Sequence, residues 1–180
     1  VEDVVHAHGC ELVRAPVGEI HVARRMQSEG AVVGGEGNGG VILPDLHHTR
    51  DAPLASALVL QHLVDEGLTL SAAVDRWPAY TIVKTKIDFP RELLPDAYAE
   101  LERQLASDGV DSTDGARFDW VERQAWLHVR PSDTEPVVRL IAEAPGRSET
   151  QKLIEEATAV RERIGGHVQD PHDCAHAVRI

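Results

Sequence analysis

The order of apolar and polar positions in residues 1–78 predicts helices that alternate with short strands. Apolar side chains recur at helical spacing in four segments, each closed by a glycine or followed by a proline. These segments are 1–9, 17–30, 49–67 and 69–77, with Thr49 or Asp51 as the N-cap of the third. Apolar runs of buried-strand length lie at 10–15, 31–35 and 41–44. The alternation predicts an α/β layer with a mostly parallel sheet.

Beyond residue 78 the pattern becomes that of an α+β domain with an antiparallel sheet. Strand-like runs lie at 80–89, 114–122, 124–130 and 137–144, and amphipathic helices at 93–109 and 148–166. We therefore expect an α/β domain at 1–78, a smaller α+β domain at 79–165 and a tail at 166–180. The tail holds His167, His172, Cys174 and His176, which either bind a soft metal or belong to a poorly ordered or non-native terminus.

Charge and composition narrow the possible partners. The formal net charge of the 180 residues is -12, which disfavours binding to nucleic acid or to an anionic membrane. No apolar run approaches the roughly 18 residues that span a bilayer. The two cysteines, Cys10 and Cys174, form no CxxC pair, so we expect a reducing, cytoplasmic location. The chain starts at Val1 and not at methionine, which suggests a fragment.

The segment AVVGGEGNGGVILP contains a G-x-G-x-x-G pattern at Gly35, Gly37 and Gly40. A dinucleotide site needs a helix that begins at these glycines, so an oxidoreductase predicts a helix from Gly39 or Gly40. Here β-prone residues and a proline follow instead, and no Gly-Lys-Ser/Thr marks a P-loop. The plain alternative is a strand-turn-strand connection whose glycines only permit positive φ angles.

Two polar side chains distinguish this loop from a plain turn. Glu36 and Asn38, the only asparagine of the chain, are flanked by glycines that allow a ligand to approach. A carboxylate accepts hydrogen bonds and an amide both donates and accepts them, which suits vicinal sugar hydroxyls. A carboxylate repels phosphate, so the loop is not expected to bind one.

A second candidate site is the turn in WLHVRPSDTEPVVRL. Its guanidinium and hydroxyl groups form a possible cradle for a phosphate monoester: Arg130, Ser132, Thr134 and Arg139. The alternative is a solvated hairpin with an ion pair between an arginine and Glu135. Asp133 opposes phosphate binding unless its side chain points away.

Together, GGEGNGGVILPDLHHTRDA and RPSDTEPVVRLIAEA resemble the α-D-phosphohexomutases, the family of phosphoglucomutase, phosphomannomutase and phosphoglucosamine mutase. RAPVGEIHVARRM is also similar to the third of that family's four domains. The resemblance covers about residues 1 to 165, and it implies a C-terminal fragment with most of the third domain and the whole fourth. Missing N-terminal domains of the same protein are then its partners.

The resemblance implies an isomerase that interconverts hexose 1-phosphate and 6-phosphate through a bisphosphorylated intermediate. A phosphoserine, Mg²⁺ and a sugar bisphosphate activator serve the reaction in such enzymes. The resemblance assigns Glu36 and Asn38 to the sugar hydroxyls of the hexose phosphate substrate. It assigns Arg130, Ser132 and Thr134 to the phosphate that is not transferred, while Arg139 either binds phosphate or supports the turn. The two loops are then expected to face a common cleft.

This chain departs from the family pattern in several places. It has neither a Thr-Ala-Ser-His-Asn-Pro-like nucleophile loop nor an Asp-Gly-Asp-x-Asp-Arg-like metal loop, so alone it is expected to be inactive. Gly40 stands where some members have histidine, and His47, His48 or Arg50 either compensate or merely lie on the surface. The loop favours a phosphomannomutase or phosphoglucosamine mutase. A phosphoglucomutase and a non-catalytic sugar-phosphate binding module are the alternatives.

Overall fold

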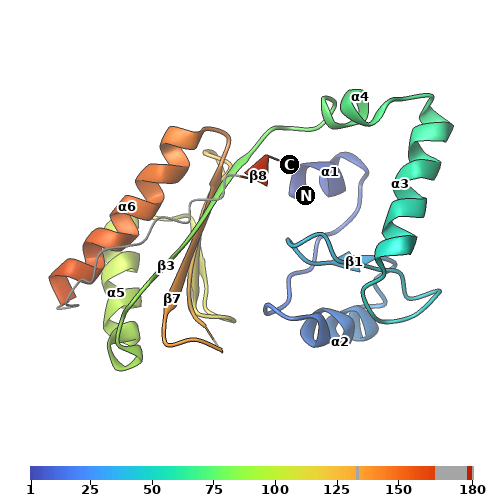
Figure 1. The fold of residues 1–180 in the computed structure, drawn as a ribbon. Helices are drawn as coiled ribbons and strands as arrows, with labels where there is room; N and C mark the ends of the chain where they lie inside the picture. The colour runs from blue at the N-terminus through green and yellow to red at the C-terminus, as the bar shows by residue number, and fades with distance from the viewer. Residues whose placement is uncertain (133, 165–177, 180) are drawn as a thin grey trace. The chain divides into compact units, whose positions relative to one another are not determined.

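The computed structural model describes residues 1–132, 134–164 and 178–179. The chain divides into two compact units, Val1–Pro78 and Ala79–Ile180 (Figure 1). None of the described helices is both long and apolar enough to cross a membrane. The histidines and the cysteine of the tail lie outside the described residues, as does Asp133.

The helices of the first unit follow the predicted pattern. The α2 helix ends at Gly30, whose φ of 65° is left-handed, and α3 ends in the same way at Gly67. Asp51 is the N-cap of α3, because its side chain accepts a hydrogen bond of 2.8 Å from the N–H of Leu54. The elements are α1 (Glu2–Ala7), α2 (Glu19–Glu29), β1 (Gly34–Gly35), β2 (Val41–Ile42), α3 (Ala52–Glu66) and α4 (Leu70–Val74).

The strands of the first unit differ from the prediction. The run at 10–15 forms no strand, and β1 and β2 pair antiparallel, whereas the sequence predicts a mostly parallel sheet. The five residues between β1 and β2 are enough for a hairpin but too few for a parallel crossover, which needs a dozen or more. An α/β unit followed by an α+β unit is nevertheless the order observed.

The first unit buries little apolar surface among its described residues. Its buried hydrophobic side chains are Ala23, Met26, Ile42 and Ala73. Helix α3 has no buried residue, and Leu58, Val59, Leu60 and Val64 on it are exposed.

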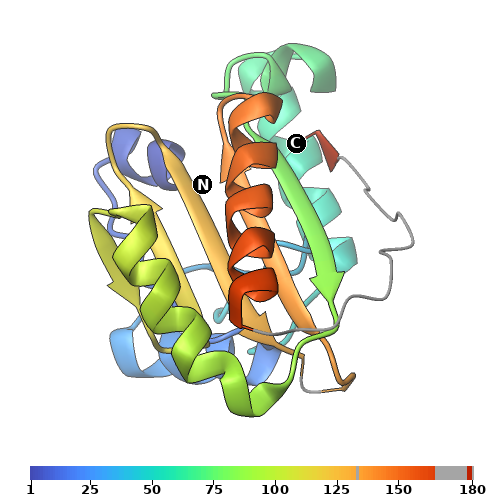
Figure 2. The ribbon, with the colours of Figure 1, turned by 90° about the vertical axis from the view of Figure 1, so that its left-hand side faces the viewer.

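The second unit contains an antiparallel sheet, as the sequence predicts, and helices cover one face of it. The strand order is β4-β5-β6-β7-β3-β8, and α5 and α6 cover the same side of the sheet (Figure 2). The elements are β3 (Thr81–Ile87), a 3-10 turn η1 (Arg91–Leu93), α5 (Leu94–Leu105), β4 (Gly109–Asp111), β5 (Ala116–Trp120), β6 (Ala125–Pro131), β7 (Val138–Ala144), α6 (Arg147–Ile164) and β8 (Val178–Arg179).

The core of this unit positions the candidate phosphate turn. Leu127 and Val129 on β6 and Leu140 on β7 are buried against Leu153 of α6 and their neighbours. Side chains alternate between the faces of a strand, so Arg130 projects from the face opposite Val129. Burying an aliphatic side chain stabilises by about 1.5–3 kcal/mol, so the packed sheet holds the β6–β7 hairpin in a fixed register.

Candidate functional site

The glycine loop is a tight connection between β1 and β2. The N–H of Glu36 donates to the carbonyl of Gly40, and the N–H of Gly39 donates to the carbonyl of Glu36, both at 3.0 Å. Gly39 has a φ of 93°, which only glycine adopts without strain. Strand β2 follows at Val41, so the helix that a dinucleotide-binding oxidoreductase requires is not formed.

Two of the five loop glycines pack against side chains from outside the loop, and two others face open space. A Cβ on Gly34 would lie 2.2 Å from the sulfur of Met26, and one on Gly40 would lie 2.3 Å from Cδ of Arg50. Helix α2 and Arg50 therefore approach the backbone as closely as glycine permits. A Cβ on Gly37 or Gly39 would meet nothing within 4 Å.

Glu36 is held in place by an arginine from the segment that precedes α3. Its side chain is 13% exposed, and its Oε2 lies 3.0 Å from Nη1 of Arg50. The approach is not aligned as a hydrogen bond, because Oε2 is buried without a hydrogen-bond partner among the described residues. Arg50 also contacts Glu19, at 3.0 Å from Nε to Oε2.

Glu19 is the most strongly perturbed acid near the loop. Its pKa falls to about 2, because the Thr49 hydroxyl and the backbone N–H of Arg50 donate to it and the Arg50 guanidinium adds its charge. The N–H of Arg50 lies 2.8 Å from the Glu19 carboxylate. Glu19 is therefore ionised at neutral pH and binds both the backbone and the side chain of Arg50.

Asn38 has one of its two polar groups engaged within the loop. Its Oδ1 accepts a hydrogen bond of 3.0 Å from the N–H of Gly40. The side chain is exposed, so its NH₂ group is the part that faces solvent and can donate to a ligand hydroxyl.

His47 has a structural contact that the sequence does not reveal. Its Nε2 lies 3.0 Å from Oδ2 of Asp51 and so braces the N-cap of α3. The hydrogen bond from Leu54 and the contact with His47 together lower the pKa of Asp51. His47 thus supports the helix cap next to the loop, and His48 is exposed.

The second candidate site is the turn between β6 and β7. Pro131 pairs with Val138, and the N–H of Ser132 donates to the carbonyl of Val137 at 2.9 Å. Ser132 is 1% exposed, and its hydroxyl lies 3.5 Å from that of Thr134. Arg91 of η1 donates a hydrogen bond to the carbonyl of Ser132 and ties the turn to a third element.

Arg130 is buried and oriented by an acid that the sequence analysis did not single out. The residue is 7% exposed, and its Nη1 lies 2.8 Å from Oδ2 of Asp114 in the β4–β5 turn. Gly115 has a φ of 79°, and a Cβ there would lie 2.4 Å from the carbonyl oxygen of Val129. The Asp-Gly pair is a turn signal in the sequence, but only the sheet register places it beside Arg130.

Three cations lie on neighbouring strands beside this turn. Arg130 pairs across the sheet with Arg139, which in turn pairs with Lys86. Like charges in direct cross-strand positions repel each other unless anions lie nearby. Asp114 at one end and Glu135, 3.5 Å from Lys86, at the other provide part of that compensation. Glu135 thus contacts a lysine, whereas the plain-hairpin alternative predicts an arginine.

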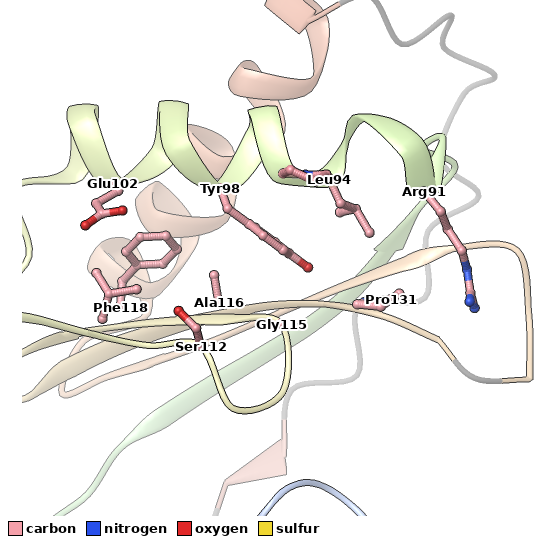
Figure 3. A pocket seen from close by; sticks show the side chains of 11 residues that line it. Arg91, Leu94, Tyr98, Glu102, Ser112, Gly115, Ala116, Phe118 and Pro131 are labelled. Carbon is pink, nitrogen blue, oxygen red and sulfur yellow. The ribbon is translucent and has the colours of Figure 1, made fainter.

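A separate cavity of about 450 Å³ lies between α5 and the sheet. Figure 3 shows Tyr98 extending from α5 toward the turn that carries Ser112 and Gly115. Burial, together with the charge of Asp114, raises the pKa of Tyr98. Arg91 and Pro131, which adjoin the β6–β7 turn, line this cavity, whereas none of the predicted phosphate ligands is among its described lining residues.

The two units match two consecutive domains of one enzyme family. Residues 1–80 match the family model described as Phosphoglucomutase/phosphomannomutase, alpha/beta/alpha domain III. Residues 94–160 match the model described as Phosphoglucomutase/phosphomannomutase, C-terminal domain. The chain belongs to this family.

Two relatives of the chain carry the names of enzymes of this family. A "Probable phosphoglucosamine mutase" from Methanopyrus kandleri is 36% identical over 172 residues, which are 94% of this chain and 38% of that protein. A "Phosphoglucomutase/phosphomannomutase" from Thermococcus kodakarensis is 31% identical over 157 residues, which are 86% of this chain and 34% of that protein. The chain thus spans little more than a third of the length of these curated relatives.

A solved structure shares the fold. A phosphoglucomutase/phosphomannomutase family protein from Burkholderia thailandensis matches 89% of this chain and 34% of its own, with a TM-score of 0.72 and 22% identity. The likeness at that identity concerns the fold alone.

The magnesium implied by the family resemblance has no ligand set among the described residues. No three His, Cys, Asp or Glu side chains gather there in a group that could hold a metal ion.

Proposed function

We propose that this chain forms the sugar- and phosphate-recognition part of a phosphohexomutase. The whole enzyme would interconvert a hexose 1-phosphate and its 6-phosphate through a bisphosphorylated intermediate. A phosphoglucosamine mutase or a phosphomannomutase is the favoured activity, with phosphoglucomutase as the alternative within the family. The names of the relatives support this assignment, since they include phosphoglucosamine mutase and phosphoglucomutase/phosphomannomutase.

The observation that carries the proposal is the ion pair between buried Arg130 and partly exposed Asp114 beside the β6–β7 turn. The guanidinium of an arginine is a rigid fork of N–H groups, and that geometry matches two oxygens of a phosphate. The Arg139 and Lys86 side chains on neighbouring strands add positive charge. Ser132 and Thr134 would add hydroxyl donors, so the turn would anchor the phosphate that is not transferred.

The glycine loop would read the sugar. Glu36 would accept hydrogen bonds from ring hydroxyls, and the NH₂ group of Asn38 would donate one. A substrate that turns around between two phosphoryl transfers needs a fixed phosphate-binding site at one end. It also needs a sugar-binding site that accepts both orientations of the ring. Phosphoryl transfer depends mainly on such positioning and on charge neutralisation.

The remaining parts of the reaction belong to the proposal for the whole protein. A phosphoserine loop and a magnesium site would lie in domains outside this chain, and bound magnesium would neutralise charge on the transferred phosphoryl group. A sugar bisphosphate would act as activator, and the protein would be cytoplasmic. The residues of this chain would bind and orient the substrate and would not donate the phosphoryl group.

A mutase assay on the product of the complete reading frame tests the proposal. Glucosamine 1-phosphate, mannose 1-phosphate and glucose 1-phosphate would each be supplied with magnesium and a catalytic amount of the matching bisphosphate. The expected result is conversion to the 6-phosphate, with the preferred sugar naming the activity. If the protein product binds these sugar phosphates but converts none of them, a non-catalytic binding module is favoured instead.

A further inference from the structure

We propose that Arg50 is a positioning residue that holds the Glu36 carboxylate in the orientation in which it reads the sugar, with Glu19 as the brace of Arg50. The inference rests on the proposed function of Glu36. It adds a residue of the segment before α3 to a loop whose sugar contacts are otherwise assigned only to Glu36 and Asn38.

The contacts of Arg50 join three segments that are distant in the sequence. Its Nη1 lies 3.0 Å from Oε2 of Glu36 in the glycine loop, and its Nε lies 3.0 Å from Oε2 of Glu19 in the first turn of α2. Its own backbone N–H donates to the other oxygen of Glu19 at 2.8 Å. A single side chain therefore bridges two carboxylates, and one of them also fixes its backbone.

The backbone around Arg50 is held on the other side as well. The N–H of Asp51, the next residue, donates to the carbonyl of Val41 in β2 at 2.9 Å, and Asp51 itself caps α3. The position of Arg50 relative to the glycine loop is therefore determined by hydrogen bonds to both α2 and β2. A side chain anchored in this way can hold another group still, which a mobile surface arginine cannot do.

Gly40 explains how the arginine reaches Glu36. A Cβ at this position would lie 2.3 Å from Cδ and 2.9 Å from Cγ of Arg50. The aliphatic part of Arg50 therefore lies directly against the backbone of Gly40. Any larger residue at position 40 would displace Arg50, so Gly40 and Arg50 are expected to depend on each other.

The two carboxylate oxygens of Glu36 therefore have different roles. Oε2 is buried and faces Arg50, which leaves Oε1 as the oxygen that accepts hydrogen bonds from a ligand. The Nε and Nη1 groups of Arg50 are already directed at carboxylates. Arg50 is for this reason assigned to positioning and not to direct contact with the substrate.

The first test measures the pairing itself in the full chain. The exchange of the Arg50 Hε proton with water would be followed by NMR in the wild type, in Glu36→Gln and in Glu19→Gln. The expected result is a protected proton in the wild type that loses protection in Glu19→Gln and, through loosening of the side chain, in Glu36→Gln. Arg25, which pairs with Glu29 at 3.2 Å on the exposed side of α2, is the matched reference. An Arg50 proton as fast as that of Arg25 in all three proteins would overturn the inference.

The second test separates sugar reading from phosphate binding. Calorimetry would compare mannose 1-phosphate with inorganic phosphate for the wild type, Arg50→Gln, Arg50→Lys and the control Arg25→Gln. We expect Arg50→Gln to bind the sugar phosphate about tenfold more weakly, inorganic phosphate to bind unchanged, and Arg50→Lys to recover part of the loss. Unchanged sugar-phosphate binding in Arg50→Gln would overturn the inference.

The two tests also distinguish failure of this inference from failure of the proposed function. If the wild type binds sugar phosphate no better than inorganic phosphate, the sugar-reading role of Glu36 fails, and Arg50 loses the positioning role with it. If the wild type prefers the sugar phosphate and Arg50→Gln keeps that preference, only the role of Arg50 fails.

Discussion

Oδ2 of Asp114 lies 2.8 Å from Nη1 of Arg130, so a partly exposed carboxylate in the β4–β5 turn fixes a buried guanidinium on β6. The two residues are brought together by the sheet register and not by a local motif. Because Arg130 is the proposed phosphate anchor, Asp114 is expected to influence how its guanidinium is presented to a ligand. The stability of the second unit and its affinity for phosphate are therefore expected to depend on the same pair.

Replacing Asp114 by alanine tests that dependence. The variant removes a carboxylate from a buried charge, so we expect the free energy of unfolding to fall by about 1–3 kcal/mol and inorganic phosphate to bind more weakly. Urea denaturation and calorimetry measure the two effects. Glu29→Ala, which breaks an exposed pair on α2, is the control and should change stability by less than about 0.5 kcal/mol. Equal stability of the two variants would contradict the prediction.

Gly115 should tolerate no side chain. Its φ is 79°, and a Cβ would lie 2.4 Å from the carbonyl oxygen of Val129 and 2.9 Å from Cα of Arg130. Backbone cannot move aside as a flexible side chain can, so Gly115→Ala is expected to destabilise the chain by about 2–3 kcal/mol. Gly109→Ala is the matched control on the adjoining strand, since a Cβ there meets nothing within 4 Å. Thermal unfolding of both variants measures the difference. Similar midpoint temperatures for Gly115→Ala and Gly109→Ala would contradict the prediction.

The lowered pKa of His128 is expected to make the free energy of unfolding fall between neutral and mildly acidic pH. Burial is the main cause that lowers its pKa below the ordinary value of 6.5, although the Asp114 carbonyl and carboxylate oppose this. The unfolded chain therefore binds a proton as the pH falls through 6.5 while the folded chain does not, and stability falls until the folded pKa is passed. Urea midpoints at pH 7.5 and 5.5 should differ less in His128→Gln than in the wild type. The exposed His62→Gln should behave as the wild type, and an unchanged pH dependence in His128→Gln would count against the prediction.

The lowered pKa of Glu19 is expected to cause a second fall in the free energy of unfolding, at more acidic pH. Its folded pKa of about 2 lies below the ordinary value of 4.5, so its contribution is present above pH 4.5 and is lost as the pH falls toward 2. Thermal unfolding between pH 5 and pH 2 should show a shallower loss in Glu19→Gln than in the wild type. Identical slopes in this window would show that the contacts with Thr49 and Arg50 contribute nothing to folding.

The sequence predicts those elements whose boundaries carry local chemical signals. Gly30 and Gly67 end α2 and α3, and Asp51 caps α3, because caps act within a few residues of the helix end. The pairing of β1 with β2 is not predicted, since the apolar runs alone do not reveal direction or partner. The same is true of the run at 10–15, which has the length and composition of a strand but forms none.

The sequence predicts the residues of the two candidate sites but not the contacts that orient them. The first quoted motif contains both Glu36 and Arg50, and the second contains Arg130. The contact of Arg50 with Glu36 and that of Asp114 with Arg130 join residues 14 and 16 positions apart, and only the fold reveals them. Sequence spacing predicts the residues of a loop well. It does not predict which distant side chain fills the space above a glycine or faces a buried charge.

Calorimetry on three proteins tests most directly whether the glycine loop binds the sugar and the β6–β7 turn binds the phosphate. The wild type, Glu36→Gln and Arg130→Lys would each be titrated with mannose 1-phosphate and with inorganic phosphate. Lysine keeps the charge but loses the fork geometry, so Arg130→Lys should bind both ligands about tenfold more weakly than the wild type. Glu36→Gln should weaken only the sugar phosphate. Equal weakening of both ligands by Glu36→Gln, or unchanged phosphate binding by Arg130→Lys, would contradict this division of roles.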